Sequence, residues 1–191
     1  MSRIGRALAR GVVAVGATYT VHDTFTRANS STSLGTADTG QAWTAHTGTW
    51  GITSNAAYLV TSSGESVATL DCGLSDIDFS VSYSGRTDDL GIVFRAIDAS
   101  NWLLVYSNPG GGVETWQRVA GSYSQLHAAA GSAGASGTLR VVTSGTSINV
   151  YLDGSVLYSV TTSQFQTETR VGLRRGAAGG TAPTWDELIV V

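Results

Sequence analysis

The chain has 191 residues, of which 42% are hydrophobic and only 13% are charged, and this length suits one all-β domain with a terminal extension. Its basic residues are eleven arginines and no lysine, and the net charge is only −3, which argues against general binding to nucleic acid. A single cysteine, Cys72, excludes an intrachain disulfide and a multi-cysteine zinc site. Without a basic neighbour in sequence, Cys72 is expected to be a small strand residue rather than a reactive thiol.

The first 18 residues differ in charge from the rest of the chain. They contain three arginines and no acidic residue, whereas residues 19–191 contain eight arginines and fourteen acidic residues. On a helical wheel the arginines would share one face and the larger apolar residues the opposite face: Arg3, Arg6 and Arg10 against Ile4, Leu8 and Val12. Because Gly5, Gly11 and Gly16 each cost a helix about 1 kcal/mol, an extended segment that orders against a partner is an equal alternative.

Residues 1–18 are open to three interpretations. The favoured one is a basic arm that anchors the protein in a larger assembly. The others are the remnant of a secretory signal and a passive tail. The apolar stretch 12–17 is far shorter than the ~20 residues that cross a bilayer, so no membrane span is expected.

From residue 19 onward, apolar and polar residues alternate at short intervals, which predicts a single all-β domain over 19–191. In segment 76–84 the apolar residues fall at every second position, which is typical of a strand with one face in water. Segments 90–97 and 101–107 are more continuously apolar, which favours central strands that are covered on both faces. Six further strands are expected at 113–119, 137–143, 147–152, 155–160, 169–175 and 184–191.

The turn residues agree with this pattern. Ser144-Gly145 and Asp153-Gly154 each separate two alternating runs, as two-residue hairpin turns do. The run 108–112 (NPGGG) is a flexible loop. With about 12 to 14 strands and no helical crossovers, we expect antiparallel sheets packed face to face as a sandwich, with the C-terminal strand paired inside a sheet.

Two parts of the chain resemble a known family. The segments 23–30 (DTFTRANS), 33–43 (SLGTADTGQAW) and 49–55 (TWGITSN) resemble the opening of concanavalin A-like or laminin-G-like jelly-roll modules in minor tail and other virion proteins of actinobacterial phages. The segments 139–142 (LRVV), 148–154 (INVYLDG) and 185–191 (WDELIVV) are similar to the end of such modules. The resemblance implies a concanavalin A-like sandwich on the tail or capsid exterior of a phage particle, bound to other virion proteins and forming a homo-oligomer there.

Acidic residues give little sign of catalysis. Glycoside hydrolysis needs two carboxyl groups on either side of one bond, and glycanases with the fold that the chain resembles carry two or three acids at alternate positions of one strand. Here Asp76 with Asp78 lacks a third acid, and Asp186 with Glu187 would point to opposite faces of a strand. We therefore expect no catalytic residues.

Metal and cofactor sites are equally sparse. The histidines His22, His46 and His127 lie far apart in sequence and are expected to be ordinary loop or surface side chains. Calcium is the ion that the resemblance to lectin-like modules would imply, and Asp88-Asp89, before the strand at residue 90, offers paired hard oxygens. Two adjacent acids in a turn are more often simply solvated, and this alternative is favoured.

Aromatic residues give the best candidate for a binding site, since sugar recognition needs aromatic faces and fixed polar groups. Trp102 and Tyr106 would share one face of their strand, and Tyr123 follows Trp116 in the next turn. If these side chains line up on an exposed face, they form a glycan site, and if they point inward they belong to the core. The core is favoured for Trp102, whereas Trp116, flanked by charged residues on its own face, is the better exposed candidate.

The leading hypothesis is therefore a non-enzymatic virion structural protein of the tail tip or fibre region, with a role in host attachment, anchored by its N-terminal arm. One alternative is a capsid decoration protein with the same sandwich. Another is a carbohydrate-binding module that recognises bacterial cell-wall glycan. The least favoured alternative is a secreted glycan hydrolase.

Overall fold

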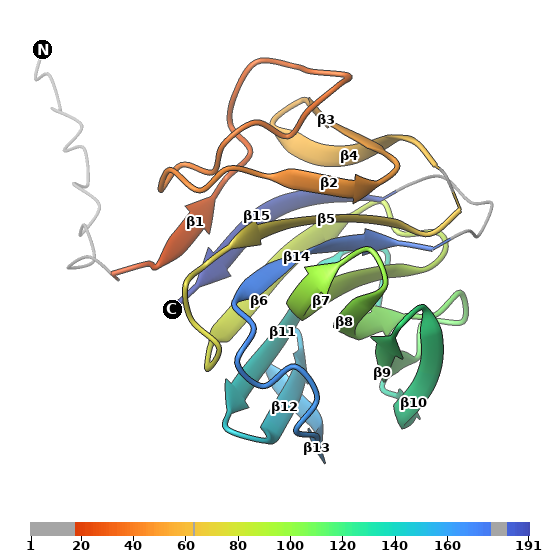
Figure 1. Ribbon diagram of the computed structural model, residues 1–191. Coiled ribbons are helices and arrows are strands. Elements are labelled where there is room, and N and C mark those ends of the chain that lie inside the picture. The colour runs from red at the N-terminus through yellow and green to blue at the C-terminus, as the bar shows by residue number, and fades with distance from the viewer. Residues whose placement is uncertain (1–17, 63, 177–182) are drawn as a thin grey trace, which may run out of the picture.

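The computed structural model describes residues 18–62, 64–176 and 183–191. Within these ranges the chain forms fifteen strands and no helix, and the strands build two antiparallel sheets that pack face to face (Figure 1). None of the described segments is a helix able to cross a membrane. The side chains assigned to the basic arm (Arg3, Ile4, Arg6, Leu8, Arg10 and Val12) lie outside the described residues.

The first sheet has eight strands in the order β13-β12-β11-β6-β15-β4-β3, and β1 pairs with β15 beyond the end of β4. Its strands are β1 (Val21–Asp23), β3 (Thr49–Thr53), β4 (Ala56–Thr61), β6 (Asp78–Ser84), β11 (Gly137–Ser144), β12 (Ser147–Leu152), β13 (Ser155–Thr161) and β15 (Thr184–Val190). The last strand in sequence thus lies near the middle of the sheet, as expected.

The second sheet has seven strands in the order β10-β9-β8-β7-β14-β5-β2. Its strands are β2 (Thr44–Thr47), β5 (Ser66–Asp71), β7 (Leu90–Asp98), β8 (Asn101–Ser107), β9 (Val113–Val119), β10 (Ser122–Ala130) and β14 (Arg170–Arg175). This sheet carries the candidate functional site on the face that points away from the first sheet.

The alternation in the sequence accounts for which face each residue takes. In β6, Phe79, Val81 and Tyr83 are buried between the sheets while the residues between them are partly exposed. Residues 90–96 of β7 are buried throughout, which confirms that this strand is covered on both faces. The main core between the sheets includes a tilted contact between the rings of Trp50 and Trp185, whose centroids are 5.3 Å apart.

Two hairpins close the β11-β12-β13 part of the first sheet. Asp153 and Gly154 both have positive φ, 49° and 79°, as a two-residue turn that matches strand twist requires. In the preceding hairpin Ser144 pairs with Ser147. The turn residues there are therefore Gly145 and Thr146, one position later than the sequence suggested.

The structure differs from the sequence-based prediction at three further places. Fifteen strands are described instead of 12 to 14, partly because β1 and β2 are too short to show a period. Tyr123 lies in strand β10 rather than in a turn; the sequence did not reveal this edge strand, because it is largely exposed and shows no alternation of buried and exposed residues. Asp76 precedes β6, where its carboxylate accepts hydrogen bonds from the backbone N–H of Gly145 at 2.9 Å and from Arg95 Nη2 at 3.1 Å.

Candidate functional site

The outer face of the second sheet gathers the aromatic residues that the sequence singled out. Alternation in β8 turns Leu103 and Val105 into the main core, and turns Trp102, Leu104 and Tyr106 to the opposite face. The register then sets the cross-strand neighbours: Trp102 opposite Arg118, Leu104 opposite Trp116, Tyr106 opposite Glu114, Tyr123 opposite Arg118 and Gln125 opposite Trp116. The four predicted aromatic residues therefore lie on one face of three adjacent strands.

A pocket of about 310 Å³ opens on this face. Its lining residues are Leu104, Tyr106, Trp116, Tyr123 and Arg174. Gly91 of β7 helps to shape it, because a Cβ at this position would come within 2.7 Å of side-chain atoms of Leu104 and Tyr106. The volume is at the lower end of the roughly 300–1,000 Å³ that small-molecule sites occupy, so the pocket has room for a small unit of a ligand.

The aromatic rings differ in exposure, and this divides their roles. Trp102 is completely buried, as expected, but it belongs to a small outer cluster with Val67, Val93, Ala96 and Leu104 rather than to the main core. Tyr123 is 44% exposed, and its ring meets Trp102 and Trp116 edge-on at centroid distances of 5.6 and 6.4 Å. Trp116 and Tyr106 are half-buried. Trp102 therefore supports the site from below, while the other three rings can contact a ligand.

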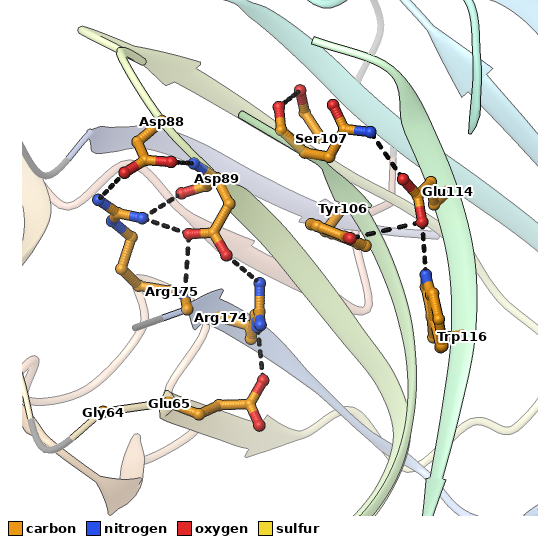
Figure 2. Close-up of polar contacts among 12 residues, drawn as sticks. Gly64, Glu65, Asp88, Asp89, Tyr106, Ser107, Glu114, Trp116, Arg174 and Arg175 are labelled. Atoms are coloured by element: carbon orange, nitrogen blue, oxygen red, sulfur yellow. Dashed lines mark hydrogen bonds and ion pairs between the residues drawn. The ribbon is translucent and has the colours of Figure 1, made fainter. Parts of the chain in front are cut away.

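Glu114, which is only 8% exposed, fixes these side chains through its carboxylate. Its Oε2 accepts hydrogen bonds from Trp116 Nε1 at 2.7 Å and from Gln125 Nε2 at 3.0 Å, and a longer one from the Tyr106 hydroxyl at 3.4 Å. Its Oε1 accepts a hydrogen bond from Asn108 Nδ2 at 2.6 Å. Figure 2 shows the contacts of Glu114 with Tyr106 and Trp116 on the right. Burial, together with the charge of Glu114, raises the pKa of Tyr106, so its hydroxyl remains a donor.

Two arginines lie against the rings. The Arg118 guanidinium carbon is 5.6 Å from the centroid of Trp102 and 5.2 Å from that of Tyr123. The Arg174 guanidinium carbon is 5.1 Å from the centroid of Tyr106. Cations at these distances are attracted to the π face of an aromatic ring, so both arginines help to hold the rings in place.

One carboxylate joins the two arginines. Glu65, immediately before β5, accepts hydrogen bonds from Arg174 Nε at 2.7 Å and from Arg118 Nη1 at 3.1 Å. Arg174 Nη1 also donates to Asp89 Oδ2 at 2.8 Å, and the Asp89 carboxylate is in turn bound by Arg175. Figure 2 shows this chain of ion pairs running from Glu65 through Arg174 and Asp89 to Arg175. These ion pairs hold the Arg174 side chain at the edge of the pocket.

Comparisons with known proteins support the fold. No protein-family model matches the sequence, and no curated protein matches it. Solved structures do match: the carbohydrate binding module CBM66 from Bacillus subtilis has 20% identity and a TM-score of 0.67, covering 76% of this chain and 92% of that module. Bacillus licheniformis beta-glucanase has 11% identity and a TM-score of 0.58, covering 93% and 99%. LamAcat from Zobellia galactanivorans has 10% identity and a TM-score of 0.58, covering 91% and 97%.

The fold is a concanavalin A-like β-sandwich. This confirms the fold class predicted from the sequence. At these identities the similarity establishes the architecture alone, because one fold of this kind supports many activities.

In this concanavalin A-like sandwich, Asp88 and Asp89 do not form the solvated turn that was favoured, nor an open pair of calcium ligands. Both are buried, with exposed fractions of 9% and 6%. The Asp89 carboxylate is bound by Arg174 and Arg175, and it accepts the backbone N–H of Gly176 at 3.1 Å. Calcium needs carboxylate oxygens that are free to bind it, whereas arginines already bind both oxygens of Asp89. Among the residues described, no group of three or more potential metal ligands comes together.

The other acids considered for catalysis are dispersed. Asp78 forms an ion pair with Arg140, and Asp76 forms one with Arg95 at 3.1 Å. Glu187 lies 3.0 Å from His22 Nε2. Each carboxylate is therefore engaged with its own basic partner rather than facing another acid across a cleft.

The remaining histidines and the cysteine have structural surroundings. The His127 ring stacks on Tyr158 with centroids 3.7 Å apart. Burial lowers the pKa of His46, whose Nε2 lies 2.8 Å from Thr69 Oγ1. Cys72 is buried, its Sγ–H donates to a backbone carbonyl 2.9 Å away, and burial raises the pKa of its thiol, all of which oppose reactivity.

The sequence identified the aromatic residues of the site but not the charged ones. Arg174 and Glu65 were missed, because strands β14 and β5 reach the pocket only through the sheet order. The one available signal was the arginine pair at the end of the expected strand 169–175, and it does not reveal a partner. Glu114 is one of the two charged residues that flank Trp116 on its strand face, and its role in holding the pocket side chains was not predicted.

Proposed function

We propose that this protein is a carbohydrate-binding module that holds a glycan in the pocket on the outer face of the second sheet. One observation carries the proposal: half-exposed rings of Tyr106, Trp116 and Tyr123 surround a pocket together with fixed polar groups. Sugar rings present C–H faces that pack on aromatic rings, and hydroxyl groups that need polar partners. Sites for small ligands combine these two features in the same way, an apolar lining with a few placed polar groups.

The carboxylates near the pocket favour binding of a glycan without its cleavage. Glycosidases need one carboxyl group that gives up a proton and another that attacks or activates water. Near the pocket, Glu114 accepts four hydrogen bonds from neighbouring side chains, and Glu65 binds two arginines. We therefore propose that neither acts on a bound glycan. The likeness to a carbohydrate binding module supports the same choice, although beta-glucanases share the fold.

A glycan array followed by calorimetric titration of the best glycan tests the proposal. Trp116→Ala and Tyr123→Ala should each lower the affinity at least about tenfold, corresponding to about 1.4 kcal/mol. Tyr151→Ala is the matched control, because this ring belongs to the first sheet and packs under Arg140. The proposed site would be refuted if the full chain binds no glycan on the array, or if the three variants and the wild type bind with equal affinity.

The setting of the module is a separate proposal, based on the sequence resemblance and the acid-free, arginine-containing N-terminal segment. We propose that the sandwich belongs to a phage virion, where residues 1–18 anchor it and the pocket faces host glycan. It belongs to the tail tip or fibre region, with capsid decoration as the alternative. Particles that incorporate a chain beginning at Tyr19 as well as the full chain would contradict the anchoring role.

A further inference from the structure

The two arginines at the pocket raise the question of what charge a bound sugar can carry. Arg174 lines the pocket, and Arg118 lies over the exposed ring of Tyr123. A free guanidinium in this position would bind a carboxylate or sulfate group through two parallel hydrogen bonds. Taken alone, the arginines would therefore favour an acidic sugar.

Glu65 changes that expectation because it forms ion pairs with both arginines. Its side chain is 16% exposed, and its two oxygens divide between Arg174 Nε at 2.7 Å and Arg118 Nη1 at 3.1 Å. Arg118 has two further hydrogen bonds, from Nη1 to the carbonyl of Ala99 at 2.8 Å and from Nε to that of Gly121 at 3.3 Å. A carboxylate on a ligand would therefore have to compete with Glu65 for each of these guanidinium groups.

The charge balance around the pocket points in the same direction. The connected ion pairs and the neighbouring Glu114 bring together three arginines and four carboxylates, which gives a formal charge of −1: Arg118, Arg174 and Arg175 against Glu65, Asp88, Asp89 and Glu114. The site therefore has no excess positive charge to offer to an anion. An acidic ligand would gain no net attraction from these charges, while an uncharged sugar meets aromatic faces and donors or acceptors already fixed in place.

We propose that Glu65 is the residue that makes this pocket select uncharged glycans over acidic ones, an inference that rests on the proposed glycan binding. It does so by pairing with the guanidinium groups of Arg118 and Arg174 and by offsetting part of their positive charge. Glu65 acts through these arginines and is a positioning residue rather than a direct ligand contact.

The experiment uses the full chain on an array that carries neutral oligosaccharides and the same backbones bearing uronate, sialate or sulfate groups. The wild type should bind only neutral members, with an affinity that does not change with salt concentration. In Glu65→Gln the two arginines lose their shared carboxylate while the side chain keeps its shape. The acidic analogue of the bound glycan should then gain at least about tenfold in affinity, and high salt should reverse the gain.

Asp186→Asn is the matched control, because it removes one negative charge from an exposed position on β15 in the other sheet. It should leave the preference for neutral glycans unchanged. A wild type that binds acidic and neutral analogues equally would overturn the inference while leaving glycan binding intact. So would a folded Glu65→Gln variant without a gain for acidic analogues. If Glu65→Gln does not fold, the wild-type preference and its independence of salt decide the matter. If the wild type binds no glycan at all, the proposed function itself fails.

Discussion

Replacing Glu114 by glutamine should disturb the pocket, because this carboxylate holds the side chains around it. The carboxylate is buried and accepts four hydrogen bonds, the shortest from Asn108 at 2.6 Å and from Trp116 at 2.7 Å. An amide offers one acceptor oxygen and one donor nitrogen. Whichever way the amide is turned, its NH₂ group faces Asn108 on one side or Trp116 and Gln125 on the other.

The expected magnitude follows from these contacts. A hydrogen bond to a charged group contributes about 1.5–3 kcal/mol, and a buried donor left without an acceptor costs about 1–3 kcal/mol. Because Trp116 and Gln125 are partly or largely exposed and can turn to water, we expect Glu114→Gln to lower the free energy of unfolding by about 2–3 kcal/mol. Glycan affinity should fall with it, since the Trp116 ring is no longer held at its Nε1.

Urea denaturation of four proteins measures the effect: wild type, Glu114→Gln, Trp116→Phe and the double variant. The cycle isolates the coupling between the carboxylate and the indole N–H, which we expect to be about 1–2 kcal/mol. Asp186→Asn serves as a charge control on the opposite sheet. Additive single-variant effects, or a cost of Glu114→Gln below about 0.5 kcal/mol, would show that the carboxylate does not organise the pocket.

Three further predictions concern stability. Burial raises the pKa of Tyr158 to about 12, and a raised pKa means that folding favours the neutral phenol. The stability that this phenol contributes is therefore complete below about pH 10 and is lost as pH rises toward 12. Urea denaturation should show a smaller difference in unfolding free energy between the wild type and Tyr158→Phe at pH 11 than at pH 8. Asp89→Asn should lower the free energy of unfolding by about 3–5 kcal/mol because it removes the buried carboxylate that Arg174 and Arg175 share, and a loss under about 1 kcal/mol would contradict this. Gly172→Ala should prevent normal pairing of β14 with β5, since its Cβ would lie 2.0 Å from the carbonyl oxygen of Ala68; a melting temperature equal to that of the wild type would be inconsistent with that contact.

The sequence predicted the architecture well because sandwich strands carry a strong local signal. In β9 and β12 the expected bounds agree with the structure residue for residue, since alternation and turn residues both mark their ends. The signal fails for β10, where Tyr123, Gln125 and their neighbours are exposed on both faces and leave no alternation to detect. A strand at the edge of a sheet has no requirement to bury one face.

The site was predictable only in part, for a reason that concerns distance along the chain. Trp102, Tyr106 and Trp116 lie in consecutive strands, so alternation alone places them on one face. Glu65 and Arg174 meet across the order β7-β14-β5, which no local pattern encodes. Burial of the two acids before β7 was likewise missed, because it depends on arginines supplied by β14.

The place of β15 near the middle of the first sheet has a consequence for how the protein is made. During synthesis β6, β4 and β1 emerge from the ribosome long before the strand that joins them. Until it arrives, each presents unpaired backbone groups of the kind that attract other chains. Sheets that depend on such distant partners form slowly, so nascent chains stalled before residue 184 should be sensitive to protease and prone to aggregate. Chains in which β15 has left the ribosome should be sharply more resistant.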